Sequence, residues 1–402
     1  MLKAPASVGL TTEVREAEHS TSASSERNIG RTIKVVHLAT RLTLAGVGNV
    51  VASLVRGMPS QLYRSAVWCL EEADVVGEDL RVEGHQVVDL QKRRRRDFAL
   101  FFRLGALLRS GRVDIIHCHD ELSWFYGTVG AWLAAMPRVV STVHGRRFDT
   151  SPRHLWEQKV LGSMSTSIVG VSVSLREQVI DEVGISPEKV SVIRNGIKIE
   201  SLEKSADQRW QTRKCLGIPE SAIVLGCIGR LDPVKNLDLL IEASVDAIRV
   251  IPSLQIIVAG EGPSKDHLLQ KTTALGLNDR IHLLGLRKDV SDLLSAIDLY
   301  ICSSDREGIS LSILEAMTAE RPVIATAVGG NLELIQHGET GLLIKKGDRD
   351  ALVQAILSLS LDAQARRRLG RKARQSVEAN FSLNRMLLDY DHLYQSMVTA
   401  PR

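Results

Sequence analysis

The segment that indicates the fold of this chain is Leu299-Tyr-Ile-Cys302-Ser-Ser-Asp-Arg-Glu307-Gly-Ile-Ser-Leu-Ser-Ile-Leu-Glu315. Its first four residues form a short apolar run that is typical of a buried strand. Gly308 marks a turn, after which we expect a helix to begin at about Ile309 or Ser310. A buried strand followed at once by a helix is the repeating unit of an α/β fold with a parallel sheet.

Similar strand-like runs, rich in β-branched residues, extend this alternation in both directions along the chain. Helical periodicity separates them, for example over 98–108, 124–135 and 237–250. The pattern predicts an α/β protein with two Rossmann-like, doubly wound domains that face each other across a cleft. The predicted strands are 33–39, 114–118, 138–143, 167–171 and 190–193, then 223–228, 254–259, 280–284, 299–302 and 322–325.

Domain boundaries follow from composition. Residues 1–29 are rich in Ser, Thr, Ala and Glu without an apolar stretch, so we expect a disordered N-terminal tail. An N-terminal domain then covers 30–200 and a C-terminal domain covers 201–382, because a polar stretch separates the two series of strands. The apolar face of the last helix must dock elsewhere, and we expect residues 383–402 to complete the N-terminal domain.

Composition excludes several classes of protein. A chain of 402 residues with 44% hydrophobic and 24% charged residues is neither disordered nor fibrous. The net charge of +4 is small for this length, so we expect no nucleic-acid partner. The five cysteines are scattered and form no Cys-x-x-Cys pair, which favours a reducing, cytoplasmic location. The sequence contains no run of about 18 apolar residues, so we expect no transmembrane helix.

Two segments carry charged residues suited to a phosphorylated ligand. Arg230 and Lys235 flank a proline-containing turn between a predicted strand and helix, where two cations can neutralise a diphosphate. Glu307 precedes the helix of the opening segment and Glu315 lies within it. The amino end of a helix attracts phosphate, and carboxylates accept hydrogen bonds from hydroxyls. The alternative interpretation is ordinary surface charge.

Together these motifs resemble the donor domain of glycosyltransferase family 4, and the likeness extends over about residues 33–398. The motifs that carry it in the second half are Gly229-Arg230, Lys235-Asn236, Gly260-Glu-Gly262-Pro263, Glu307-x7-Glu315, Val328-Gly329-Gly330 and Gly338-x2-Gly341. Those in the first half are Gly46, Asp114-Ile-Ile-His117-Cys-His119, His144-Gly145, Val171-Ser172 and Asn195-Gly196-Ile197.

The resemblance implies a GT-B fold and a retaining hexosyltransferase. Such an enzyme moves a hexose from a nucleotide-diphospho-sugar to a glycan or lipid-linked acceptor, in polysaccharide or glycolipid biosynthesis. It implies that the N-terminal domain serves the acceptor and the C-terminal domain binds the donor. No cofactor and no metal are implied, since the nucleotide sugar is a co-substrate.

The resemblance also implies roles for individual residues. The catalytic set would be Arg230 and Lys235 on the donor diphosphate, Glu307 on the donor sugar, and His144 near that sugar. Glu315 would bind the ribose hydroxyls, and backbone N–H groups of the helix start would meet the distal phosphate. The remaining substrate-binding residues would be Gly46, Asn195, Gly308, Ile309, Ser310 and Leu311.

Two further patterns have the composition of metal ligands, and we interpret both as structural. Asp348-Arg-Asp350 opens a predicted helix, so Asp348 is expected to cap it. In His117-Cys118-His119-Asp120, alternate side chains of a strand point to opposite faces, so the histidines need not converge with Cys118.

Two other functions stay open beside glycosyl transfer. These are a nucleotide-sugar epimerase of the same fold and a non-catalytic protein that binds sugar nucleotides. A nicotinamide dehydrogenase is unlike this chain, because no predicted strand precedes Gly-x-Gly-x-x-Gly. The basic run 92–96, just before the apolar stretch 98–102, suggests peripheral contact with an anionic membrane at its inner face.

Overall fold

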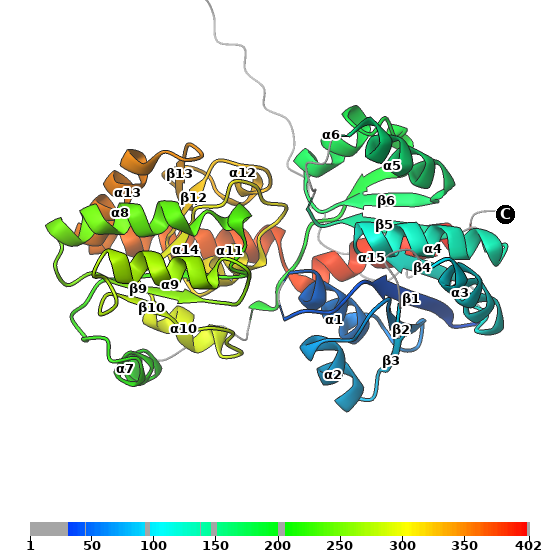
Figure 1. The fold of residues 1–402 in the computed structure, drawn as a ribbon, viewed down its shortest axis with the longest axis horizontal. Coiled ribbons are helices and arrows are strands. Elements are labelled where there is room, and N and C mark those ends of the chain that lie inside the picture. Colours follow the sequence, from blue (N-terminus) through cyan, green and yellow to red (C-terminus); the bar gives the residue numbers. More distant parts are fainter. Residues whose placement is uncertain are drawn as a thin grey trace, which may run out of the picture.

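The computed structural model describes residues 31–44, 46–92, 97–136, 138–145, 151–199 and 206–399. Two parallel β-sheets, each covered by helices, form two lobes that lie side by side (Figure 1). The expected α/β fold of two Rossmann-like domains is confirmed. The predicted tail, residues 1–29, lies outside the described residues, as do Arg93–Arg96 of the basic run.

The N-terminal sheet has seven parallel strands in the order β3-β2-β1-β4-β5-β6-β7. β1 and β4 pair so that His37 lies in register with His117. The strands are β1 Ile33–Ala39, β2 Tyr63–Cys69, β3 Gln86–Asp89, β4 Ile115–Cys118, β5 Val139–Val143, β6 Ser167–Gly170 and β7 Val190–Val192. The helices are α1 Val47–Gly57, α2 Val75–Val82, α3 Phe98–Ser110, α4 Glu121–Leu133, α5 Pro152–Met164, α6 Val173–Asp181 and the 3₁₀ turn Pro187–Lys189.

The C-terminal sheet has six parallel strands in the order β10-β9-β8-β11-β12-β13. The strands are β8 Val224–Ile228, β9 Gln255–Ala259, β10 Ile281–Leu283, β11 Leu299–Cys302, β12 Val323–Thr326 and β13 Gly341–Ile344. The helices are α7 Ala206–Cys215, the 3₁₀ turn Pro233–Lys235, α8 Leu237–Val250, α9 Lys265–Ala274, α10 Val290–Ala296, α11 Leu311–Thr318, α12 Asn331–Leu334, α13 Arg349–Leu361, α14 Ala363–Asn380 and α15 Leu383–Thr399.

Three strands and one helix go beyond the sequence-based prediction. β3 and β13 are four-residue strands at the sheet edges and are only partly buried, and β3 has just two apolar residues between Gln86 and Asp89. In β2 the polar Arg64 and Ser65 follow the buried Tyr63, and the strand is continuously buried only from Ala66 to Cys69. α7 occupies most of the polar stretch between the two series of strands. Local polarity concealed β2, β3 and α7, whereas β13 is apolar but only four residues long.

The last helix, α15, returns from the C-terminal lobe to the N-terminal sheet (Figure 1). Met386, Tyr390, Tyr394 and Met397 are buried in one cluster with residues of β1, β4 and β5. Burying a large apolar side chain contributes roughly 1.5–3 kcal/mol, so this face holds the helix in place. The Tyr63 hydroxyl also donates a hydrogen bond of 2.6 Å to Asp391.

The chain passes between the lobes twice, and the two passages are paired. The Ile197 N–H donates to the Phe381 carbonyl at 2.9 Å, and the Leu383 N–H donates to the Ile197 carbonyl at 2.9 Å. Gly196 packs against this second passage so closely that a Cβ there would lie 2.5 Å from the Ser382 carbonyl oxygen. The two crossings therefore run side by side and are hydrogen-bonded to each other.

Candidate active site

The loop after β8 is held by its own capping groups. Asp232 caps the 3₁₀ turn Pro233–Lys235 by accepting from the Val234 N–H at 3.4 Å. Asn236 adopts the left-handed conformation, with φ of 46°, and its side chain accepts from the Leu239 N–H of α8. Its amide also donates to Asp305 at 3.0 Å, which ties the loop to the segment that follows β11. Lys235 is thereby placed at the carboxyl end of the sheet.

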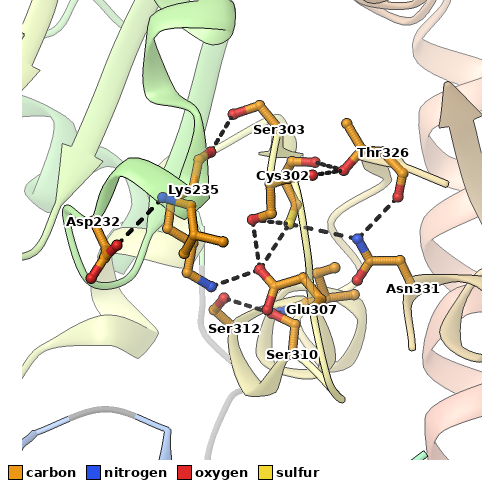
Figure 2. A network of polar contacts seen from close by, with 12 residues as sticks. Asp232, Lys235, Cys302, Ser303, Glu307, Ser310, Ser312, Thr326 and Asn331 are labelled. Carbon is orange, nitrogen blue, oxygen red and sulfur yellow. Dashed lines mark hydrogen bonds and ion pairs between the residues drawn. The ribbon is translucent and has the colours of Figure 1, made fainter. Parts of the chain in front are cut away.

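Lys235 and Glu307 form an ion pair in this position, with 2.6 Å between Nζ and Oε1 (Figure 2). The same carboxylate oxygen accepts from the Ser304 hydroxyl at 2.6 Å and from the Cys302 thiol at 3.6 Å. Burial opposes the positive charge of Lys235, but attraction to Glu307 raises the pKa of Lys235 above its ordinary value. Lys235 therefore keeps its positive charge at neutral pH.

The predicted helix begins as expected, and Ser310 is its cap. The Ser310 hydroxyl accepts from the Ile313 N–H at 3.4 Å, so α11 starts at Leu311. Ile309 and Ser310 are buried, while Leu311 is half-buried. The Asn195 amide donates to the Ile309 carbonyl at 3.4 Å, and Asn195 itself is buried. Asn195 thus connects the N-terminal lobe to the start of α11.

Gly308 lies where the two lobes touch. A Cβ at this position would come within 2.2 Å of the His144 carbonyl oxygen, which follows β5 in the other lobe. Behind it, a Cβ on Gly330 would lie 1.7 Å from the Gly308 carbonyl oxygen. Neighbouring elements thus pack on Gly308 from two directions, and a larger residue would force them apart.

Glu315 lies within α11, and burial raises its pKa to about 7. Within the described part of the chain it forms no ion pair. A carboxyl group in this state is poised to accept hydrogen bonds when ionised and to donate one when protonated. Glu307 and Glu315, which look alike in the sequence, therefore differ in environment, since only Glu307 has a cation beside it.

A cavity of 1190 Å³ brings residues of both lobes together. Arg230 and Lys235 line it from the C-terminal lobe and His144 lines it from the N-terminal lobe. The Arg230 side chain is 64% exposed, so its charge is available to a ligand. The N-terminal wall also includes the aromatic residues Phe98, Phe101, Trp124, Phe125 and Tyr126, and the polar residues Asp120, Glu121, His154 and Gln158.

Gly46 opens α1 in the N-terminal lobe. Its φ of 54° lies in the left-handed region, where L side chains are strained. A Cβ would meet no described atom within 4 Å, so conformation and not crowding favours glycine here. Gly46 is not among the residues that line the cavity.

The two patterns with metal-ligand composition differ in their outcome. Asp348 caps α13 by accepting from the Ala351 N–H at 2.9 Å, as predicted. His117 and His119 converge away from Cys118 on a third histidine, His37, and one nitrogen from each ring lies within 4.8 Å of the others. Sequence reasoning missed His37. Its signal was the parallel position of His37 and His117 near the ends of two similar strands.

Known proteins match this chain along most of its length. A model described as "Glycosyltransferase Family 4" matches residues 44–201, and one described as "Glycosyl transferases group 1" matches residues 208–376. A UDP-Gal:alpha-D-GlcNAc-diphosphoundecaprenol alpha-1,3-galactosyltransferase of Escherichia coli is 27% identical over 378 residues, which is 91% of this chain and 97% of the relative. An N-acetyl-alpha-D-glucosaminyl L-malate synthase of Bacillus anthracis is 28% identical over 319 residues, 75% of this chain and 80% of the relative.

Solved structures agree on the fold. The crystal structure of Anabaena HepE in complex with UDP and glucose superposes with a TM-score of 0.80 at 22% identity, covering 90% of this chain and 100% of that one. Two doubly wound lobes with cations, carboxylates and a histidine at their junction, together with these matches, define a glycosyltransferase. The chain belongs to glycosyltransferase family 4 and has the GT-B fold.

Proposed function

We propose that this enzyme transfers a hexose from a nucleotide-diphospho-sugar to a glycan or lipid-linked acceptor, with retention of the anomeric configuration. One observation carries the proposal. Arg230 and Lys235 line the same interlobe cavity as His144. Cations at the carboxyl end of one sheet, facing a polar group from the other lobe, suit a diphosphate bound with its sugar toward the N-terminal lobe.

The donor is held in the C-terminal lobe. Arg230 and Lys235 bind its diphosphate, and the N–H groups around Gly308, Ile309, Ser310 and Leu311 meet the distal phosphate and the sugar. Glu307 accepts hydrogen bonds from hydroxyls of the sugar, and Glu315 accepts them from the ribose. Gly46 lets the first loop approach the diphosphate, Asn195 supports the helix start, and His144 contacts the sugar.

Retention follows from attack on the face that the leaving group vacates. The bond between the anomeric carbon and the phosphate oxygen breaks, and the acceptor oxygen forms the new bond on the same side. The departing diphosphate takes the acceptor's proton. Chemistry of this kind depends on stabilising the negative charge of the leaving group, which is the role of Arg230 and Lys235. It needs neither a metal ion nor a cofactor.

Two other activities are separated from this one by their products. An epimerase of the same fold would convert the nucleotide sugar without any acceptor. A non-catalytic protein would bind the nucleotide sugar and leave it unchanged. Asp120, the acid of the cavity wall nearest His119 in sequence, accepts from the Thr40 N–H and hydroxyl, both at 2.6 Å. Because both carboxylate oxygens of Asp120 already accept hydrogen bonds from Thr40, Asp120 is poorly suited to act as the acid or base of an epimerase.

The test begins with nucleotide sugars. Thermal shift and hydrolysis assays across a set of UDP-, GDP- and ADP-sugars identify the donor, and an acceptor panel of free glycans and polyprenyl-diphosphate sugars follows. Proton NMR of the first product reports the anomer. A product with the donor's anomeric configuration supports the proposal. An inverted product, an epimerised nucleotide sugar, or binding without turnover of any donor and acceptor contradicts it.

The acceptor proposal includes peripheral contact with an anionic membrane from the cytoplasmic side. Phe98 and Phe102 lie one turn apart on α3 and are 66% and 68% exposed, and in the sequence Asp97 separates Phe98 from the basic run 92–96. Exposed aromatic side chains that follow a basic run in the sequence suit the boundary of anionic headgroups. Among the described helices, none has the length and apolarity needed to cross a bilayer.

A further inference from the structure

A row of imidazole rings leads from the cavity wall into the core of the N-terminal lobe. His144 Nε2 lies 3.3 Å from His119 Nδ1, and His119 Nε2 lies 3.1 Å from His37 Nδ1. His37 and His119 are buried to 1% exposure or less. Both nitrogens of His119 are therefore occupied by other imidazoles, and His144 is tied to the interior through one of its own nitrogens.

Burial disfavours the charged form of all three rings. Burial lowers the pKa of His144 to about 4 and that of His37 to about 3. Burial, followed by repulsion from neighbouring histidines, also holds the pKa of His119 well below its ordinary value. A neutral imidazole has one N–H and one bare nitrogen. Facing nitrogens form a hydrogen bond only when one of them carries the proton, so the proton positions along the row are coupled.

The hydrogen bonds along the row can therefore point in one of two directions, either from His37 toward His144 or from His144 toward His37. The ring at the inner end, His37, distinguishes the two arrangements. His37 Nε2 is buried and has no hydrogen-bond partner among the described residues. One arrangement leaves a bare lone pair there, and the other leaves an N–H without an acceptor. Buried N–H groups without an acceptor are the rarer of the two in proteins. The favoured row runs from His37 Nδ1–H to His119 Nε2 and from His119 Nδ1–H to His144 Nε2.

We infer that His37 and His119 are positioning residues that hold His144 as its Nδ1–H tautomer. His144 Nε2 then accepts from His119, and the nitrogen left for a substrate is a hydrogen-bond donor. Naming the donor sugar as the partner of this N–H rests on the proposed function, whereas the tautomer does not. An imidazole fixed in this way donates a hydrogen bond and does not act as a general base.

A metal ion is the competing occupant of this cluster, because His37, His117 and His119 approach one another closely. His117 argues against it. Its Nδ1 lies 2.6 Å from the Tyr394 hydroxyl and its Nε2 lies 2.7 Å from the Thr142 hydroxyl, so both nitrogens are already bonded. Ligation would break one of these bonds and also one of the two contacts of His119, either with His37 or with His144.

The first test is spectroscopic and uses the full chain labelled with nitrogen-15 in its 11 histidines. Long-range proton–nitrogen correlations identify the tautomer of each ring, and a His144→Gln sample assigns its signals. We expect a single Nδ1–H tautomer at His144 from pH 6 to pH 8. An Nε2–H tautomer, or a mixture of the two, overturns the inference, and so does a stoichiometric metal ion found by elemental analysis.

Two substitutions of His119 provide a matched pair. Asn can place an N–H where His119 Nδ1 lies and so keep the donor to His144, whereas Gln reaches the position of Nε2 and loses that donor. We expect H119N to preserve the His144 tautomer and H119Q to populate both tautomers. Unchanged His144 signals in H119Q would overturn the inference.

Activity gives a second readout for the same pair. With the identified donor, we expect kcat to fall about 10-fold or more in H119Q, as when a partner that fixes a histidine tautomer is lost, and less in H119N. KM for the donor should change less than kcat. Equal losses in the two variants would assign His119 a merely structural role. If the wild-type protein itself transfers no sugar, the proposed function is contradicted. The tautomer of His144, measured by NMR, still decides the present inference.

Discussion

The ammonium group of Lys235 lies 2.6 Å from the carboxylate of Glu307, and this pair joins the two loops that we assign to the donor (Figure 2). Each residue comes from the carboxyl end of a different strand, β8 or β11. A diphosphate that binds Lys235 competes with Glu307 for the same cation. The proposed donor site is thus also a stabilising contact of the C-terminal lobe, and substitutions here should affect both binding and folding.

Replacing Lys235 with Ala is expected to lower turnover at least about 100-fold, because the charge on the leaving diphosphate loses its stabilising cation. Steady-state kinetics with the identified donor measure this. Lys372→Ala is the matched control. Lys372 lies on α14 and forms an exposed ion pair with Glu339. Thermal unfolding of both variants separates lost chemistry from lost folding. Near-normal turnover in Lys235→Ala would contradict the donor assignment.

Replacing Gly308 with Ala should open the contact between the lobes. The added Cβ would meet the His144 carbonyl oxygen at 2.2 Å, and overpacking of this kind costs about 1–3 kcal/mol of stability. We expect a lower Tm and a turnover reduced about 10-fold or more, since the cavity is assembled across this contact. Gly145→Ala is the control, because its Cβ would meet no described atom within 4 Å. Equal behaviour of the two variants would show that the contact does not matter.

The carboxyl group of Glu315 should make stability depend on pH. Burial raises its pKa to about 7 from an ordinary value of 4.5, so the folded chain binds a proton that the unfolded chain releases between these values. Its contribution to stability is therefore largest below pH 4.5 and is lost as the pH rises to 7. Glu315→Gln keeps the shape without the charge. We expect it to raise Tm at pH 8 and to change Tm little at pH 5.

Donor affinity should also depend on the ionisation of Glu315, but it should rise with pH where the stability falls. Ionised Glu315 accepts hydrogen bonds from ribose hydroxyls better than the protonated acid does. Donor affinity measured by calorimetry should therefore rise from pH 6 to pH 8 in the wild type and stay level in Glu315→Gln. A parallel rise in both proteins would assign the pH dependence to another group.

Membrane contact is tested with sedimentation on vesicles that contain anionic lipid. A variant with Ser at Arg93 to Arg96, and a second one with Phe98→Ser and Phe102→Ser, should both bind less than the wild type. Leu361→Ser, on α13 of the other lobe, removes an apolar side chain of similar exposure and should bind normally. If the wild type does not bind the vesicles at any salt concentration, the proposed membrane contact is wrong.

The sequence was most informative where a property is local. β11 and α11 could be placed from the apolar run Leu299–Cys302 and the turn at Gly308, because strand burial and helix capping depend on neighbours in the chain. Asp348 was recognised as a cap for the same reason. The short edge strand β3 escaped prediction because its partial burial leaves no continuous apolar signal.

By itself, the amino-acid sequence determined the α/β class, the two series of strands and the segments that carry Arg230, Lys235 and Glu307. Those properties reside in periodicity and short spacing. Only the tertiary structure decided that Lys235 pairs with Glu307, that His144 meets Gly308, and that His37 completes a row with His119. Each of these contacts joins residues more than 70 positions apart, and such distances are set by how sheets and lobes pack, which no local pattern records.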